Sequence, residues 1–167
     1  VTFMIIFYVT YCYNRYTQQF DDVRAIMQDI VYVCVQARFS FSDPAESNLL
    51  YRYLNLTHMF AYGSLGKCTW FTEVEPGQLI CLGLLTKEEA AVLDHTPNLW
   101  RMDTVVSWIS KDVQRGMHDG ILNSACRAVL FKHLSDLRMW NANLAAVSVT
   151  AQPNLWSALM KILTDAL

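Results

Sequence analysis

The chain of 167 residues contains no run of lysine or arginine, and its formal net charge is only −2. Proteins that bind nucleic acid rely on clustered cations to neutralise phosphates, so we expect no nucleic-acid partner. Charged residues make up 17% of the chain and hydrophobic residues 53%. This balance lies on the apolar side of the globular average, and it indicates a protein that is partly in lipid or in a large interface.

Closely spaced metal-binding or redox residues are also missing. The five cysteines are widely separated, and none of the four histidines lies near a cysteine or another histidine at ligand spacing. We therefore expect reduced, buried thiols, no metal site and no cofactor. The sequence has no Gly-rich phosphate loop and no nucleophile elbow, and the His118-Asp119 pair lies in a glycine-rich turn. These absences predict that the protein is not an enzyme.

The apolar run at the amino-terminal end is too short to cross a membrane. Residues 1–13, VTFMIIFYVTYCY, carry no formal charge, and Asn14 and Arg15 close the run. A bilayer core needs about 20 helical residues, so this segment is either part of a membrane helix or a buried soluble helix. Because the chain begins inside the apolar run, we expect residues 1–20 to be the end of a membrane helix that starts upstream of this sequence.

Phe3, Phe7 and Tyr11 recur at every fourth position, which places their rings on one face of a helix. Two interpretations of this face remain open. The rings either pack against a neighbouring helix, which is the more common reason for such spacing, or face the axis of a symmetric oligomer. In the second case, stacked rings form an apolar constriction of the kind that gates channels by dewetting.

The rest of the chain shows helical periodicity and no segment that alternates with period two, so the predicted fold class is all-α. The expected helices cover residues 1–20, 23–37, 44–63, 86–96, 97–115, 121–144 and 154–167. The first two are expected to be separate helices because Asp21 and Asp22 suit the start of the second. Carboxylates at that position cap free amides and favour the positive end of the helix dipole.

Local signals mark the other boundaries. Asp43 and Pro44, followed by Glu46, predict a helix start with a capping box. Thr86 and Glu89 predict a second capping box. Breaks are expected from glycine and proline at Gly63 or Gly66, at Pro76-Gly77, before Pro97, between Gly116 and Gly120, and between Ser148 and Pro153.

Five short stretches together resemble the bestrophin family of anion channels. They are FYVTYCYNRY, RYLNL, LGLLTKEEA, RGMHDGIL, and an LR pair with a proline fifteen residues later, in the family's order and approximate spacing. The resemblance implies one bestrophin-like domain over residues 1–167, a helical bundle partly in the membrane and partly in the cytosol. Residues 1–20 would end a pore-lining membrane helix, 21–150 would form mostly cytosolic helices, and 153–167 would start a further helix, in or near the membrane.

The resemblance also implies a function. It predicts a multi-pass membrane protein that forms a homopentamer with one central pore for chloride or other small anions. Phe3 and Phe7 match the aromatic neck of that pore, with Ile6 beside them. Ile121 or Ala125 matches a second, cytosolic constriction, depending on which flanking stretch anchors the alignment. The calcium ligands of the family lie beyond this sequence, so no calcium site is expected in it.

Some positions depart from the family pattern. The arginine that follows R-Y-x-N-L in the family is absent from residues 62–65, and Lys161 and Asp165 follow Pro153, where a membrane helix should begin. Charges at mid-bilayer cost roughly 2.5 to 3.5 kcal/mol each. These departures keep a second function open, that of a divergent, non-conducting bestrophin-like subunit with a structural role among unrelated membrane subunits.

Overall fold

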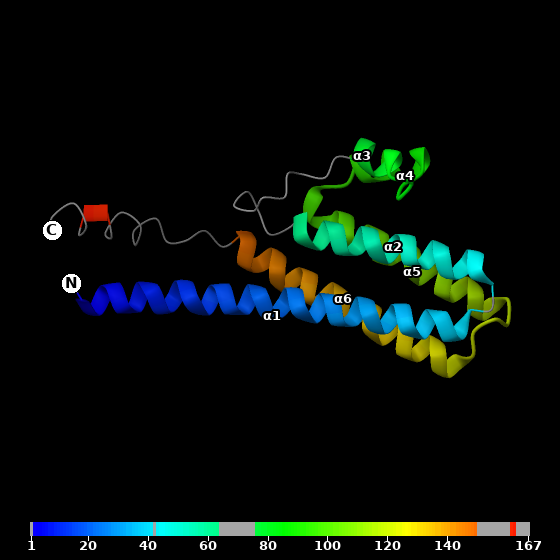
Figure 1. Cartoon of the computed structure of the whole chain (residues 1–167), viewed down its shortest axis with the longest axis horizontal. Helices are drawn as coiled ribbons and strands as arrows, with labels where there is room; N and C mark the ends of the chain where they lie inside the picture. Colours follow the sequence, from blue (N-terminus) through cyan, green and yellow to red (C-terminus); the bar gives the residue numbers. More distant parts are fainter. Residues whose placement is uncertain (1, 42, 64–75, 150–160, 163–167) are drawn as a thin grey trace.

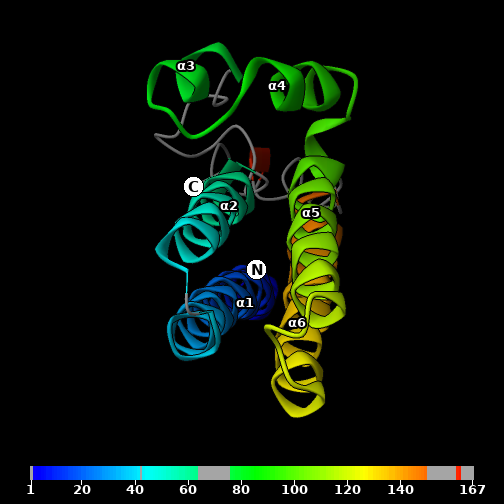
Figure 2. The ribbon, with the colours of Figure 1, turned by 90° about the vertical axis from the view of Figure 1, so that its right-hand side faces the viewer.

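The computed structural model of the chain describes residues 2–41, 43–63, 76–149 and 161–162. Within these ranges it contains helices and turns and no strand, so the predicted all-α class is confirmed. The helices are α1 Thr2–Ser40, α2 Pro44–Gly63, α3 Pro76–Cys81, α4 Lys87–Asp94, α5 Asn98–His118 and α6 Ser124–Val149. The four long helices form a bundle, and the short α3 and α4 lie on the side of α2 and α5 that faces away from α1 (Figures 1 and 2).

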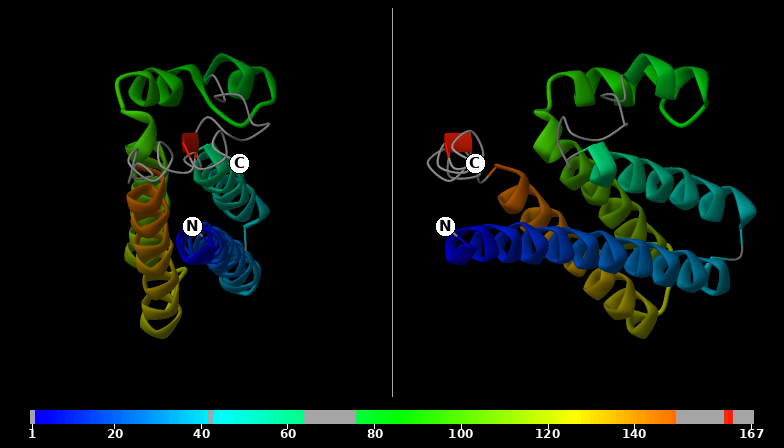
Figure 3. Two further views of the ribbon diagram at one scale, coloured as in Figure 1. Left: turned by 90° about the vertical axis from the view of Figure 1, so that its left-hand side faces the viewer. Right: turned by 60° about the vertical axis from the view of Figure 1, so that its left-hand side comes forward.

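The core lies between the four long helices. Helix α1 packs against α6 and α2, and α5 packs against α2 and α6, with α6 crossing α1 obliquely (Figure 3). Almost completely buried side chains come from each of them: Ile26 and Val33 from α1, Leu54 from α2, Ile109 from α5, and Leu130 and Leu137 from α6. All four described cysteines are at least partly exposed, which contradicts the expectation of buried thiols.

Helix α1 is continuous over 39 residues, so the prediction of two helices separated at Asp21 and Asp22 is wrong. No glycine or proline lies in this part of the sequence, so nothing interrupts the backbone hydrogen bonds. Asp21 is exposed, whereas Asp22 turns into the bundle and is only 5% exposed. At 1.5 Å per residue the helix is about 58 Å long, which lets one element reach from one end of the bundle to the other.

The start and end of α2 confirm the sequence prediction, with one exception. Asp43 accepts a hydrogen bond at Oδ1 from the amide of Ala45 at 2.9 Å, and Pro44 is the first helical residue. The helix ends at Gly63. Glu46 does not complete a capping box, because its Oε2 is buried without a hydrogen-bond partner.

Two predictions concern the region before Pro97. The start of α4 is confirmed, whereas the loop predicted at Pro76-Gly77 is wrong. Pro76-Gly77 begins α3 and does not form a loop, because the fixed φ of proline suits the first position of a helix. The capping box at α4 is confirmed: the Thr86 hydroxyl accepts from the Glu89 amide at 3.2 Å, and the Glu89 carboxylate accepts from the Thr86 amide at 2.9 Å. Helix α4 ends at Asp94, before Pro97 as expected.

Thr86→Ala should lower the free energy of unfolding by about 1 kcal/mol, because it leaves the amide of Glu89 without its side-chain acceptor. Chemical denaturation of the purified protein measures this change. Lys87→Ala is the matched control, because Lys87 is the exposed neighbour of Thr86 and a surface substitution there should cost less than about 0.5 kcal/mol. Equal losses in the two variants would show that the cap does not stabilise the fold.

The break between α5 and α6 lies three residues later in the chain than predicted. Gly116 stays inside α5, where an added Cβ would lie 3.1 Å from Cε1 of Phe41 and 3.2 Å from Cδ1 of Leu122. Its role is therefore close packing, while the turn itself uses Gly120 at φ +74°. Helix α6 begins at Ser124, three residues after the expected start, because the Asn123 side chain accepts from the amide of Cys126 at 2.7 Å and caps it.

The carboxyl-terminal predictions are partly tested. Within the helix predicted over residues 121–144, Leu122, Leu134, Leu137 and Leu144 are buried, whereas Ala125 and Val129 are exposed and Leu130 lies in the core. Helix α6 continues to Val149, so the interruption expected from Ser148 does not begin there. Residues 161–162 are helical, and the rest of the helix predicted over 154–167 lies outside the described residues.

Candidate functional site

The three predicted neck residues lie on the first turns of α1 and are exposed. Phe3 is 71%, Ile6 58% and Phe7 55% exposed. The Phe3 and Phe7 rings contact each other edge to face, with centroids 4.7 Å apart. These turns extend beyond the described end of α6 (Figure 1). Within the described part of the chain these rings do not belong to the core, so they are available to lipid, to a second chain or to a pore.

Exposure extends over most of this end of α1, although Ile5, Tyr8 and Cys12, which share one face, are half-buried. Tyr11 continues the Phe3–Phe7 face and is 43% exposed, while Val9 and Tyr13 lie on other sides of the helix and are 58% and 64% exposed. The packing interpretation of the aromatic face is not realised among the described residues of this chain.

The two residues predicted for the second constriction lie in or directly after the turn between α5 and α6. Ile121 is in the turn itself, held by a hydrogen bond from its amide to the Gly116 carbonyl at 2.9 Å, and is 38% exposed. Ala125 is exposed in the first turn of α6. This turn lies at the end of the bundle opposite the first residues of α1 (Figure 1). The structure thus brings Ile121 and Ala125 close in the fold and keeps both far from Phe3 and Phe7.

A polar network joins α2 to α4 and connects two of the stretches on which the family resemblance depends. Arg52, from RYLNL, forms two hydrogen bonds to the Glu89 carboxylate of LGLLTKEEA, at 2.7 and 2.8 Å. Tyr53 donates to the same carboxylate at 2.7 Å, and Arg52 also donates to the Leu84 carbonyl at 3.1 Å. Sequence reasoning had identified the Glu89 cap but not this second role. The ion pair between Arg52 and Glu89 therefore brings the two stretches into contact in the folded chain.

The electrostatics of this network are those of a structural ion pair. Burial pushes the pKa of Glu89 upward, but hydrogen bonds from Arg52, the Thr86 amide and Tyr53 outweigh it and hold the pKa at about 2. Burial and the hydrogen bond to Glu89 raise the pKa of Tyr53 to about 12. Glu89 is therefore ionised and Tyr53 neutral at physiological pH. Because the side chains of Arg52 and Tyr53 on α2 both bind Glu89 on α4, the network holds α4 against α2.

A second buried polar contact, which sequence reasoning missed, joins α1 to α6. Asp29 is 9% exposed, and its Oδ1 lies 2.9 Å from Nδ1 of His133. Its Oδ2 accepts a hydrogen bond from Nε1 of Trp140 at 3.1 Å. Tyr32 stacks on the His133 ring with centroids 5.2 Å apart. The available signal was that Asp29 shares the buried face of α1 with Ile26 and Val33, at spacings of three and four residues.

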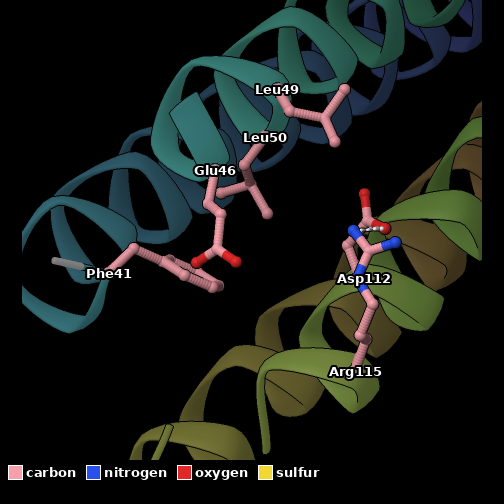
Figure 4. A pocket seen from close by; sticks show the side chains of 6 residues that line it. All are labelled: Phe41, Glu46, Leu49, Leu50, Asp112 and Arg115. Atoms are coloured by element: carbon pink, nitrogen blue, oxygen red, sulfur yellow. Dashed lines mark hydrogen bonds and ion pairs between the residues drawn. The ribbon is translucent and has the colours of Figure 1, made fainter. Parts of the chain in front are cut away.

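A small hollow lies between α2 and α5. Its lining includes Glu46 and Leu50 from α2 and Asp112 and Arg115 from α5, and the last two form an ion pair at 2.8 Å (Figure 4). The space open to a water-sized molecule is about 10 Å³, roughly the room that one water molecule needs. Burial raises the pKa of the Asp112 carboxyl. The hollow is too small to hold an organic ligand.

No helix within the described residues combines the length and the apolar character that a bilayer crossing needs. Helix α1 is long enough, but its apolar first turns give way to a segment that contains Arg15, Asp21, Asp22 and Arg24.

Comparison with protein families identifies a match over most of the chain. Residues 1–164 match the Bestrophin family, described as "Bestrophin, RFP-TM, chloride channel". No curated protein and no solved structure matches the chain. The family match covers nearly the whole sequence and includes the exposed turns of α1, the network between α2 and α4, and the turn before α6. The resemblance is thereby confirmed, and the chain belongs to the bestrophin family of chloride channels.

Proposed function

We propose that this chain is a subunit of a membrane channel that conducts chloride or other small anions passively. Five copies would surround one pore, with Phe3, Ile6 and Phe7 lining its neck. The observation that carries the proposal is the family match over residues 1–164, together with neck residues that are more than half exposed in the single chain. Large apolar side chains that are exposed together on one element indicate a surface used in an assembly or a membrane.

The chemistry of the neck suits a weakly hydrated anion. Residues 1–14 carry no formal charge, so selectivity there would come from the positive edges of aromatic rings. Phe3 and Phe7 meet edge to face, which leaves ring edges available to an ion. An apolar ring of such side chains also excludes water when it is narrow, and therefore keeps the closed pore dry.

A second constriction near the turn between α5 and α6 completes the proposed pathway. Ile121 and Ala125 are both exposed at that end of the bundle. Isoleucine is the larger side chain, and of the two it is the one that can narrow a pore by its own bulk. We therefore assign the cytosolic constriction to Ile121.

Phe7→Ala should increase the chloride current through the resting channel several-fold, because a narrow apolar constriction loses a large side chain and becomes hydrated. Single-channel and macroscopic recordings in planar bilayers measure this current. Val9→Ala is the matched control: Val9 is 58% exposed, but two residues along a helix place it on the other side of α1. Its current should equal that of the wild type.

Two results would contradict the proposal. Intact pentamers that pass no chloride current would leave only the structural role for this subunit. One copy of the chain embedded among unrelated membrane proteins would contradict the pentamer itself. Native mass spectrometry of a membrane extract, followed by bilayer recording of the same sample, separates these two results.

A further inference from the structure

Three side chains of metal-binding type meet between α1 and α6, although they are far apart in the sequence. They are Asp29 from α1 and His133 and Asp136 from α6, and one ligand atom of each lies within 4.8 Å of the others. His133 and Asp136 are three residues apart, which places them on the same side of their helix. The expectation of no metal site came from sequence spacing alone, and 104 residues separate Asp29 from His133.

The surroundings hold two of these ligands in a fixed orientation. Trp140 donates to Oδ2 of Asp29 at 3.1 Å, which leaves Oδ1 directed at His133. Tyr32 stacks on the His133 ring, with an angle of 22° between the planes. Such supporting contacts orient metal ligands in known sites and contribute to their affinity. The three ligand atoms, which lie within 4.8 Å of one another, would move closer together to bind an ion.

The charge balance of the cluster also favours a cation. Two carboxylates lie close together, and Asp29 is only 9% exposed. Among the described residues, neither carboxylate forms an ion pair with lysine or arginine, since those pairs are Arg52–Glu89 and Arg115–Asp112. Like charges near each other in a poorly solvated place repel strongly unless a positive charge lies between them.

We propose that Asp29, His133 and Asp136 bind a divalent transition-metal ion of the zinc type, which links α1 to α6. One imidazole nitrogen and two carboxylate oxygens are ligands that zinc accepts, and three protein ligands leave a fourth position for water. Magnesium and calcium prefer sites made entirely of oxygen. The proposal does not depend on anion conduction, because no neck or constriction residue is among the ligands.

Zinc titration of the purified, metal-free protein tests this site, with the melting temperature as the readout. The wild type should melt at a higher temperature as zinc is added, with saturation, and magnesium at equal concentration should give no increase. Asp136→Asn should weaken zinc affinity at least about tenfold. Without zinc the variant should melt no lower than the wild type, because it removes one of two neighbouring negative charges. Asp136 makes no hydrogen bond to the described residues, so its loss leaves the Asp29, His133 and Trp140 contacts intact.

Asp119→Asn is the matched control, since Asp119 is an exposed carboxylate at the end of α5, outside the cluster. It should respond to zinc like the wild type. The proposal is overturned if the wild type shows no saturable increase in melting temperature. It is also overturned if Asp136→Asn responds like the wild type, because both proteins keep all five cysteines and zinc bound by thiols would stabilise them equally.

Discussion

Glu89→Gln should lower the free energy of unfolding at neutral pH by about 3 kcal/mol. Glutamine keeps the size of the side chain but removes the charge that Arg52 faces at 2.7 and 2.8 Å. The two side chains are only 19% and 16% exposed, so water replaces the lost partner poorly. Removing one member of a buried ion pair costs about 3–5 kcal/mol, and partial exposure puts this pair at the lower end. Chemical denaturation of the two proteins measures the difference.

Glu88→Gln is the control for this prediction. Glu88 is the preceding residue, exposed in the first turn of the same helix, and contributes only its interaction with the helix dipole, typically 0.3–1 kcal/mol. If the two variants lose the same free energy, the network between α2 and α4 is no more than a surface ion pair. A loss confined to Glu89→Gln shows that it anchors α4 to the bundle.

The parts of this fold that the sequence predicts correctly are those set by local chemistry. A proline at a first helical position, a threonine cap with its glutamate three residues later, and a glycine at positive φ act within a few residues. Pro44, Thr86 and Gly120 are therefore predicted correctly from their neighbours alone. The family resemblance was visible for the same reason, since it depends on short stretches in a fixed order.

The errors arise where the same residue type fits both a helix boundary and a helix interior. Asp21 and Asp22 suit a helix start, but an aspartate also fits inside a helix when no glycine or proline interrupts the backbone. Asp22 lies there despite burial, and burial, with Asp21 beside it, raises its pKa. Gly116 likewise suits a break but stays in α5, because its missing Cβ leaves room for Phe41 and Leu122. Only the three-dimensional neighbours decide these cases.

For the candidate sites, too, the sequence predicts what local spacing determines and misses what depends on contacts between distant parts. That Phe3 and Phe7 share a face follows from their spacing, but what that face contacts is not encoded in the spacing. The Asp29, His133 and Asp136 cluster requires α1 and α6 to pack in one register. A single signal was present in the sequence, an aspartate at the spacing of a buried apolar stripe, and it identifies no partner.

Acid should destabilise the wild type relative to Glu89→Gln, and the difference between them isolates one titration. Glu89 has an ordinary pKa of 4.5 that the fold lowers to about 2. A carboxyl group whose folded pKa is lowered stabilises the fold above its unfolded pKa, and this contribution is lost as pH falls through the folded value. The shift corresponds to about 3 kcal/mol, and the side chain is only 16% exposed, so solvent screens little of it.

The gap in unfolding free energy between the two proteins should therefore be about 3 kcal/mol above pH 5 and under about 1 kcal/mol near pH 2. Burial raises the pKa values of Asp103 and Asp112, and protonation of these groups favours the fold as pH falls. The acid response of the wild type alone therefore mixes opposite effects, and the comparison with Glu89→Gln removes those that the charge of Glu89 does not influence. A gap that stays constant from pH 6 to pH 2 would show that Glu89 titrates normally in the folded protein, and Arg52 would then not be its charge partner in solution.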